Sequence, residues 1–200
     1  MNNKIGMIGS VLTAISVALF AVFMLIVFNF GSFFICIFLS LGFVLIISAF
    51  AQECEPNKKA AANAAMIFAA VYCVIILLVY FAQITSVRLD GLNEQAIQIV
   101  DYSKSGLYFN YDLLGYGLMA LSTFFIGLTV KADSKVDKWL KWLLIIHGIF
   151  FIACLIMPVL GIFSSNTESG YWGGVIALEF WCAYFLPVCI LSYLHFKRKQ

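Results

Sequence analysis

The sequence predicts an all-α integral membrane bundle of six transmembrane helices. Both termini are expected on the cytoplasmic side, with a short amphipathic surface helix between the third and fourth spans. Two observations lead to this prediction. The chain is 64% hydrophobic and only 11% charged, whereas a soluble domain carries about a quarter charged residues. Six apolar runs also reach the ~20 residues that a bilayer requires. They cover residues 7–29, 32–51, 61–83, 112–130, 139–163 and 172–194.

These runs are expected to be helices, because backbone groups inside a bilayer must form their hydrogen bonds within the segment. The short alternating strands of a membrane β-barrel are not seen in the sequence. The first run is too long for a cleavable signal peptide, and no small-residue cleavage site follows it. With no linker and no internal repeat, residues 1–200 are predicted to form a single domain.

The connections predict how the runs are arranged. Residues 29–31 form a very short turn, so the first two helices should be an antiparallel hairpin. Within the long connection 84–111, apolar residues recur at helical spacing between residues 92 and 100. This pattern predicts a surface helix that residues 90–91 could turn and cap.

The fifth and sixth runs carry their own signals. Asp133 or Ser134 can cap a helix that continues into the fifth run, and Trp139 and Trp142 would then lie at the cytoplasmic interface. Proline removes a backbone donor, so Pro158 and Pro187 are expected to kink these two helices. Two kinked helices are compatible with a cavity between them.

Charge predicts the orientation. Ten of the twelve Lys and Arg residues lie at the N-terminus, in the second and fourth connections, or at the C-terminus. On the other side there are only Arg88 and Lys104. By the positive-inside rule both termini should be cytoplasmic, and the expected location is the bacterial cytoplasmic membrane.

Glu179 is the outstanding polar residue of the sixth run. It lies seven residues from the start at 172, which is about 10 Å below the outer boundary. A charge at that depth is costly, so it should face the bundle or a wet cavity, be paired, or be protonated. Other polar residues occupy the outer parts of their runs and could converge with Glu179 on one outward-facing ligand pocket. They are Gln83, Arg88, Asp112 and Tyr116. A structural alternative is a polar clamp that fixes helix packing.

His147 is the other titratable group inside a run. It lies about 12 Å from the cytoplasmic boundary. One interpretation makes it a station on a proton path with Glu179, and the other makes it a hydrogen-bonding partner of a neighbouring helix.

Other functions find little support in the sequence. The six cysteines lack CxxC spacing, and five of them lie in apolar runs, so we expect buried free thiols. We therefore predict no metal site and no cofactor. Motifs of hydrolases, nucleotide-binding proteins and dinucleotide-binding proteins are missing, so no catalytic residue is predicted. The net charge of +2 gives no reason to expect nucleic acid as a partner.

Two segments suggest a family. "YFAQITSVRL" at the end of the third run and "YDLLGYGLMALSTFF" opening the fourth resemble a family of uncharacterised bacterial membrane proteins. These proteins are small, multi-pass and most familiar from Firmicutes. The resemblance implies a helical bundle in the cytoplasmic membrane with no assigned activity.

A small-residue motif points to a second comparison. Residues 14–18, "AISVA", are similar to the docking motif of the substrate-capture subunits of vitamin transporters. Those subunits have a longer first loop that acts as a lid, whereas this chain has a tight turn.

The leading functional hypothesis is a non-enzymatic membrane protein that binds or translocates a small amphiphilic or lipid-like molecule through the pocket around Glu179. The surface helix would be its lid. The alternative is an accessory or regulatory subunit that docks on a partner membrane protein, and the third is an intramembrane enzyme. Membrane lipids are expected partners in every case.

Overall fold

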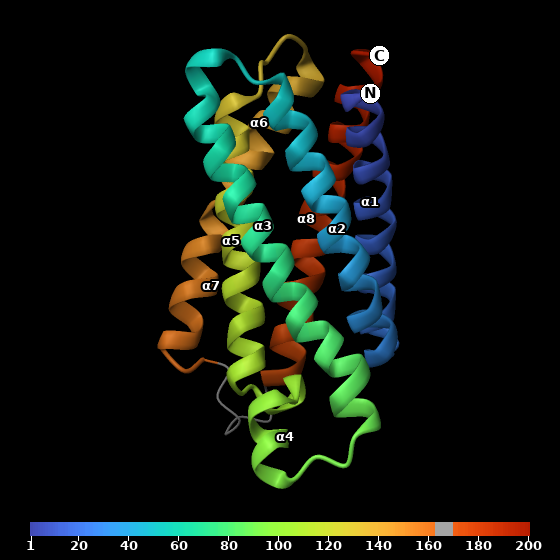
Figure 1. The fold of residues 1–200 in the computed structure, drawn as a ribbon. Helices are drawn as coiled ribbons and strands as arrows, with labels where there is room; N and C mark the ends of the chain where they lie inside the picture. Colours follow the sequence, from blue (N-terminus) through green and yellow to red (C-terminus); the bar gives the residue numbers. More distant parts are fainter. Residues whose placement is uncertain (163–169) are drawn as a thin grey trace.

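The computed structural model describes residues 1–162 and 170–200, with the backbone alone at 170–173. In these ranges the chain is helical, and six stretches are long and apolar enough to cross a membrane, as predicted (Figure 1). Residue 163 and the side chain of Trp172, at the ends of two predicted runs, lie outside the described part. The spanning helices are α1 (Asn2–Leu25), α2 (Asn29–Glu53), α3 (Lys59–Ala82), α5 (Leu107–Thr129), α6 (Lys135–His147) followed by α7 (Ile149–Val159), and α8 (Gly170–Arg198).

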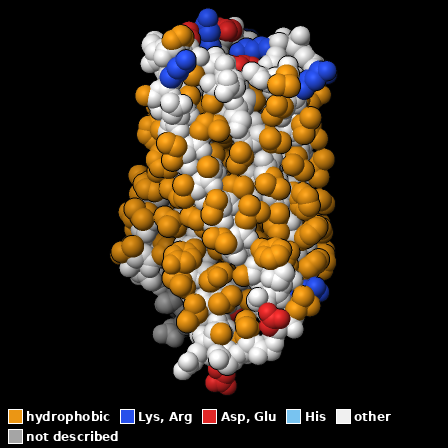
Figure 2. Space-filling model, in the orientation of Figure 1, with side chains coloured by type: hydrophobic (Ala, Val, Ile, Leu, Met, Phe, Trp, Pro, Cys, Tyr) orange, Lys and Arg blue, Asp and Glu red, His pale blue; other side chains and the backbone are white. Residues whose placement is uncertain are grey.

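Apolar side chains cover the length of the bundle, and charged side chains gather at its two ends (Figure 2). One end holds both termini and the connections 54–58 and 130–134, and we name it the basic end (Figure 1). The opposite end holds α4 (Glu94–Val100), and we name it the α4 end. Large apolar side chains such as Leu78 and Ile152 are more than half exposed between the two ends. Lipid is the solvent that such a surface requires, and the chain is a multi-pass integral membrane protein.

The first two helices form the predicted hairpin. Their backbones approach closely where Gly9 meets Gly42, since a Cβ on Gly9 would lie 2.8 Å from the Gly42 carbonyl oxygen. A Cβ on Gly42 would lie 2.5 Å from Oγ1 of Thr13. Small residues at a crossing allow this approach. The turn itself places Val27 at a φ of 57°, a conformation that costs a β-branched residue energy.

Helix α3 ends in a π-helical turn, η2 (Gln83–Val87). The connecting segment 88–106, which we name the strap, then leads through α4 to η3 (Tyr102–Lys104). The predicted surface helix is therefore present, although its cap differs from the prediction. Asn93, rather than residues 90–91, caps α4 by accepting a hydrogen bond from the Ala96 N–H at 2.8 Å. The reason is that α4 begins only at Glu94, so the Asn93 side chain is the one within reach.

The fifth span is broken in the middle. Ser134 caps α6 as predicted, accepting from the Asp137 N–H. The helix then breaks at Gly148, ahead of Pro158, which lies in the last turn of α7. A Cβ on Gly148 would lie 2.8 Å from Cβ of Phe124, so the close approach of α5 requires glycine at this point. Pro187 lies inside α8 without ending it.

The helices pack so that the last one joins the first. α8 packs against α1 and α6, and α5 packs against α3, α6 and α7 (Figure 1). α7 buries none of its side chains, which makes the second half of the fifth span the most peripheral part of the bundle.

Candidate functional site

Asp112, in the second turn of α5, is the centre of a buried polar site at the α4 end. It is 2% exposed, although a carboxylate is costly to bury. Tyr102 of η3 donates a hydrogen bond to its Oδ2 at 3.1 Å. Its Oδ1 is buried and has no hydrogen-bond partner among the described residues. One acceptor oxygen of this buried acid therefore lies without a hydrogen bond among the described residues, although the Tyr80 hydroxyl is close to Asp112.

Tyr102 covers this acid, and aromatic rings pack around the Tyr102 side chain. Burial, with the carboxylate of Asp112 nearby, raises the pKa of the Tyr102 phenol well above its usual value, so it stays a donor. Its ring contacts Phe33 at 5.6 Å, Tyr80 at 6.3 Å and Phe109 at 5.1 Å between centroids. Rings from α2, α3 and α5 therefore pack around the Tyr102 ring that covers the carboxylate.

Gln83 holds the strap that carries Tyr102. It lies in the π-helical turn at the end of α3 and is 4% exposed. Its Nε2 donates to the Val100 carbonyl oxygen at 2.8 Å, and its Oε1 accepts from the Tyr102 N–H at 3.0 Å. π-helical turns widen a helix locally and are frequent at functional sites. Gln83 thereby fixes the backbone on both sides of Asp101, and the Tyr102 side chain is positioned over Asp112.

Tyr116 lies one turn deeper than Asp112 on the same helix. Its Oη is 3.7 Å from Sγ of Cys36. Its ring meets Tyr72 and Trp181 edge-on, at 5.7 and 5.3 Å. The Tyr72 hydroxyl is also buried and without a hydrogen-bond partner among the described residues. A column of polar aromatic side chains therefore continues from Asp112 into the bundle.

His147 follows this column toward the basic end, and its tautomer is determined. Trp181 Nε1–H donates to its Nε2 at 3.0 Å. Since indole nitrogen only donates, Nε2 carries no proton and Nδ1 does. Nδ1 is 2.7 Å from Thr123 Oγ1, which donates in turn to the Ala120 carbonyl oxygen. The neutral ring links α5, α6 and α8, and protonating Nε2 would require Trp181 to give up its bond.

Glu179 lies apart from this column. It is half-buried, and its Oε1 is buried with no partner among the described residues. Successive helical residues are about 100° apart. Glu179 therefore points some 160° away from Trp181, whose ring contacts Tyr116 of α5. No contact between Glu179 and Tyr116 is found among the described residues.

Arg88 lies outside the column as well. Its side chain extends along the surface, where Nε donates to the Ile84 carbonyl oxygen at 3.2 Å. Its guanidinium carbon lies 5.0 Å from the centroid of Phe30. The structure therefore brings together Gln83, Asp112 and Tyr116, and leaves Arg88 and Glu179 elsewhere.

A second polar cluster, which sequence reasoning missed, lies at the basic end. Nδ1 of His195 is 2.6 Å from Asp137 Oδ1, and its Nε2 is 2.9 Å from Glu53 Oε2. Arg198 also pairs with Asp137, and Lys199 with Glu53. Ionised carboxylates only accept, so both ring nitrogens donate and the arrangement suits an imidazolium. The cluster ties α2, α6 and α8 together.

The sequence contained a signal for part of this second polar cluster. Glu53, Asp137 and His195 all lie at the ends of runs on the side with most basic residues, so topology alone brings them to one end. Tyr102 had no comparable signal, because its position depends on the strap. In the described part of the chain, no three His, Cys, Asp or Glu side chains are grouped to hold a metal ion. All six cysteines are unpaired, and four are buried.

Comparison with known proteins adds no relative. No family model, no curated protein and no solved structure matches this chain. The function must therefore be argued from the site itself.

Proposed function

We propose that this protein is a non-enzymatic membrane protein that binds a small amphiphilic molecule at Asp112, entering from the outer face of the membrane. The observation that carries the proposal is the Asp112 Oδ1, an acceptor that is buried and unpartnered among the described residues. A buried polar atom without a partner costs about 1–3 kcal/mol of stability. A ligand whose donor group bonds to Oδ1 would remove this cost, which favours binding.

The sidedness follows from charge. Ten of the twelve Lys and Arg residues belong to the basic end or the helix termini beside it, which by the positive-inside rule supports a cytoplasmic position for that end in a bacterial cell. The α4 end, with Asp112 beneath it, then faces outward.

The site suits a particular ligand chemistry. Asp112 accepts, so the polar group should be a hydrogen-bond donor, and an ammonium fits best because the surrounding rings of Tyr80 and Tyr102 attract cations. The apolar part of the ligand would lie among Phe33 and its neighbours. Tyr102 acts as the lid, since the Tyr102–Asp112 bond must open for exchange, and Gln83 sets how firmly the strap is held.

Glu179 remains a second candidate contact for such a molecule, on a different side of α8. If the ligand crosses the membrane, Glu179 or His147 would have to take part. These roles are tested separately from Asp112.

The first experiment is native mass spectrometry of the gently solubilised protein, comparing wild type with Asp112→Asn and Glu179→Gln. Asp90→Asn is the matched control, an exposed acid at the same end. A small bound mass that Asp112→Asn alone loses would support the proposal. An adduct that survives Asp112→Asn, or wild type that binds nothing, contradicts it.

A second measurement tests the ligand class. Dodecylamine should raise the melting temperature of the wild type more than dodecanoate does, and Asp112→Asn should abolish the difference. An equal shift from both amphiphiles would rule out recognition by the acid.

An accessory subunit is the second candidate. The observation in its favour is α7, which buries no side chain in the bundle and leaves an apolar helix face for another membrane protein. Reproducible co-purification of a second polypeptide, lost when Ile152 or Ile156 is changed to Trp, would favour this reading over the ligand site.

A further inference from the structure

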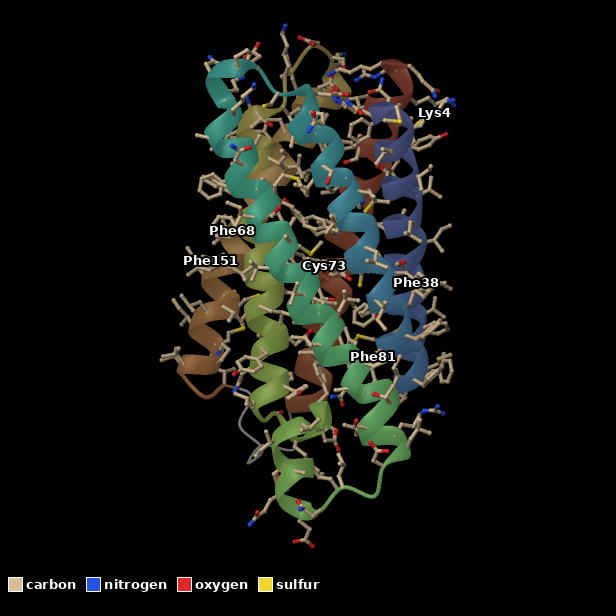
Figure 3. The ribbon with its side chains drawn as sticks, viewed as in Figure 1. Lys4, Phe38, Phe68, Cys73, Phe81 and Phe151 are labelled. Carbon is tan, nitrogen blue, oxygen red and sulfur yellow. The ribbon has the colours of Figure 1, made fainter. Side chains whose placement is uncertain are left out.

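A groove runs along the lipid-facing side of α3 near the α4 end, separate from the Asp112 site. It is an open surface depression with a volume of about 470 Å³. Figure 3 labels Phe81 on α3 and Phe38 on the neighbouring α2, and both side chains are exposed. The residues that define the groove for this argument are Ile37, Leu78, Phe81, Ala82, Thr85 and Ser86.

Polarity changes in order along this groove. Its deeper part is apolar, with Ile37, Leu78 and Phe81. One turn nearer the α4 end, it carries the hydroxyls of Thr85 and Ser86. Arg88 follows within a further turn, beyond the hydroxyls. Apolar, hydroxyl and cationic groups therefore succeed one another from the membrane interior toward the surface.

Arg88 is held in place but not neutralised. Its Nε is fixed on the Ile84 carbonyl oxygen, and its guanidinium lies against Phe30. Neither of its terminal nitrogens has a hydrogen bond or ion pair within the described residues. Guanidinium binds phosphate with two parallel hydrogen bonds. The charge is thus oriented by two contacts and free to take an anion at the depth of the lipid headgroups.

We propose that this groove is a specific site for a phospholipid of the outer leaflet, with the phosphate on Arg88 and one acyl chain beside Phe81. The Thr85 and Ser86 hydroxyls lie where the glycerol esters would be. The order of groups in the groove repeats the order of groups in the lipid. This site shares no residue with the proposed Asp112 site, so either can fail without the other.

The test is lipid retention by native mass spectrometry during stepwise delipidation, with dioleoylphosphatidylglycerol added back. Arg88→Gln should weaken binding about tenfold, the loss expected from a charge-assisted bond. Lys104→Gln is the matched control, the other basic residue at this end, and should bind like the wild type. Equal retention by Arg88→Gln and wild type overturns the proposal.

Two further arms separate the headgroup from the chain. Dioleoylglycerol lacks the phosphate, so its binding should not respond to Arg88→Gln. Ala82→Phe fills the groove without touching Arg88 and should weaken both lipids. If dioleoylglycerol competes with the phospholipid on equal terms, or if Ala82→Phe has no effect on either, the site is not as described.

Discussion

At the scale of single residues, the buried histidines show how a membrane protein can satisfy a polar ring in two ways. His147 is neutral, because a tryptophan donates to one nitrogen and a threonine hydroxyl accepts a hydrogen bond from the N–H of the other. His195 lies between two carboxylates instead. The same side chain therefore links three helices by neutral hydrogen bonds in the middle of the bundle and bridges two carboxylates near its end.

Trp181→Phe should lower the free energy of unfolding by about 1 kcal/mol, because Nε2 of His147 would be left buried without a donor. Unfolding in mixed detergent and SDS measures it. Trp139→Phe is the control, since Trp139 is exposed at the basic end and should change little. Equal losses in the two variants would mean that ring size matters and the hydrogen bond does not.

His195→Ala should be costlier, about 3 kcal/mol, because it leaves the buried Asp137 and the largely buried Glu53 facing each other without a cation between them. The same unfolding assay applies. Glu55→Gln breaks an exposed pair with Lys58 at 3.0 Å and should change the stability little, because solvent screens such pairs. A small effect of His195→Ala would show that Arg198 and Lys199 suffice for the two acids.

At the scale of helices, the α1–α2 crossing depends on glycine. Gly42→Ala should destabilise by about 1–3 kcal/mol through overpacking, since the added Cβ meets the backbone nitrogen of Thr13 at 3.0 Å. Gly174→Ala meets nothing within 4 Å and should be neutral or slightly stabilising. Melting temperatures in one detergent compare the two. Equal changes in melting temperature for the two variants would mean that helix propensity, and not close packing, causes the effect of Gly42→Ala.

The helices were largely predictable, whereas their breaks were not. Length and hydropathy give the six spans, because the bilayer imposes the same requirement on each. The break at Gly148 depends on how close α5 comes, which is a tertiary fact. Pro158 is the stronger signal in sequence, yet α7 continues through it to Val159.

The candidate site was predictable only by depth. Gln83, Asp112 and Tyr116 lie at a similar depth and close to one another. Arg88 and Glu179 lie at a similar depth but apart from these three residues. Depth follows from distance along a helix, but facing direction depends on which helices are neighbours. Tyr102 completes the site from a connection whose path is set by Gln83, and no pattern in sequence fixes such a path.

At the scale of the whole molecule, the side of the membrane that the Asp112 site faces depends on the predicted orientation of the chain. With Cys54 changed to Ala, Ser103→Cys should react with a membrane-impermeant maleimide in intact cells, and Asn57→Cys only after lysis. Both positions are exposed, at the α4 end and the basic end respectively. The reverse pattern would invert the topology and place the Asp112 site on the cytoplasmic side.

The packing of α8 against α1 also bears on how the protein is made. Synthesis proceeds from the N-terminus, so α1 and α2 enter the membrane long before α8 exists. Until then the face of α1 around Gly6, which receives Phe196 of α8, is open to lipid. His195, Arg198 and Lys199 are made after α2 and α6, and they close the cluster on Glu53 and Asp137. The last turn of α8 thus completes a cluster whose other members are already in the membrane, and replacing His195, Arg198 and Lys199 would leave α8 inserted without its ties to α2 and α6.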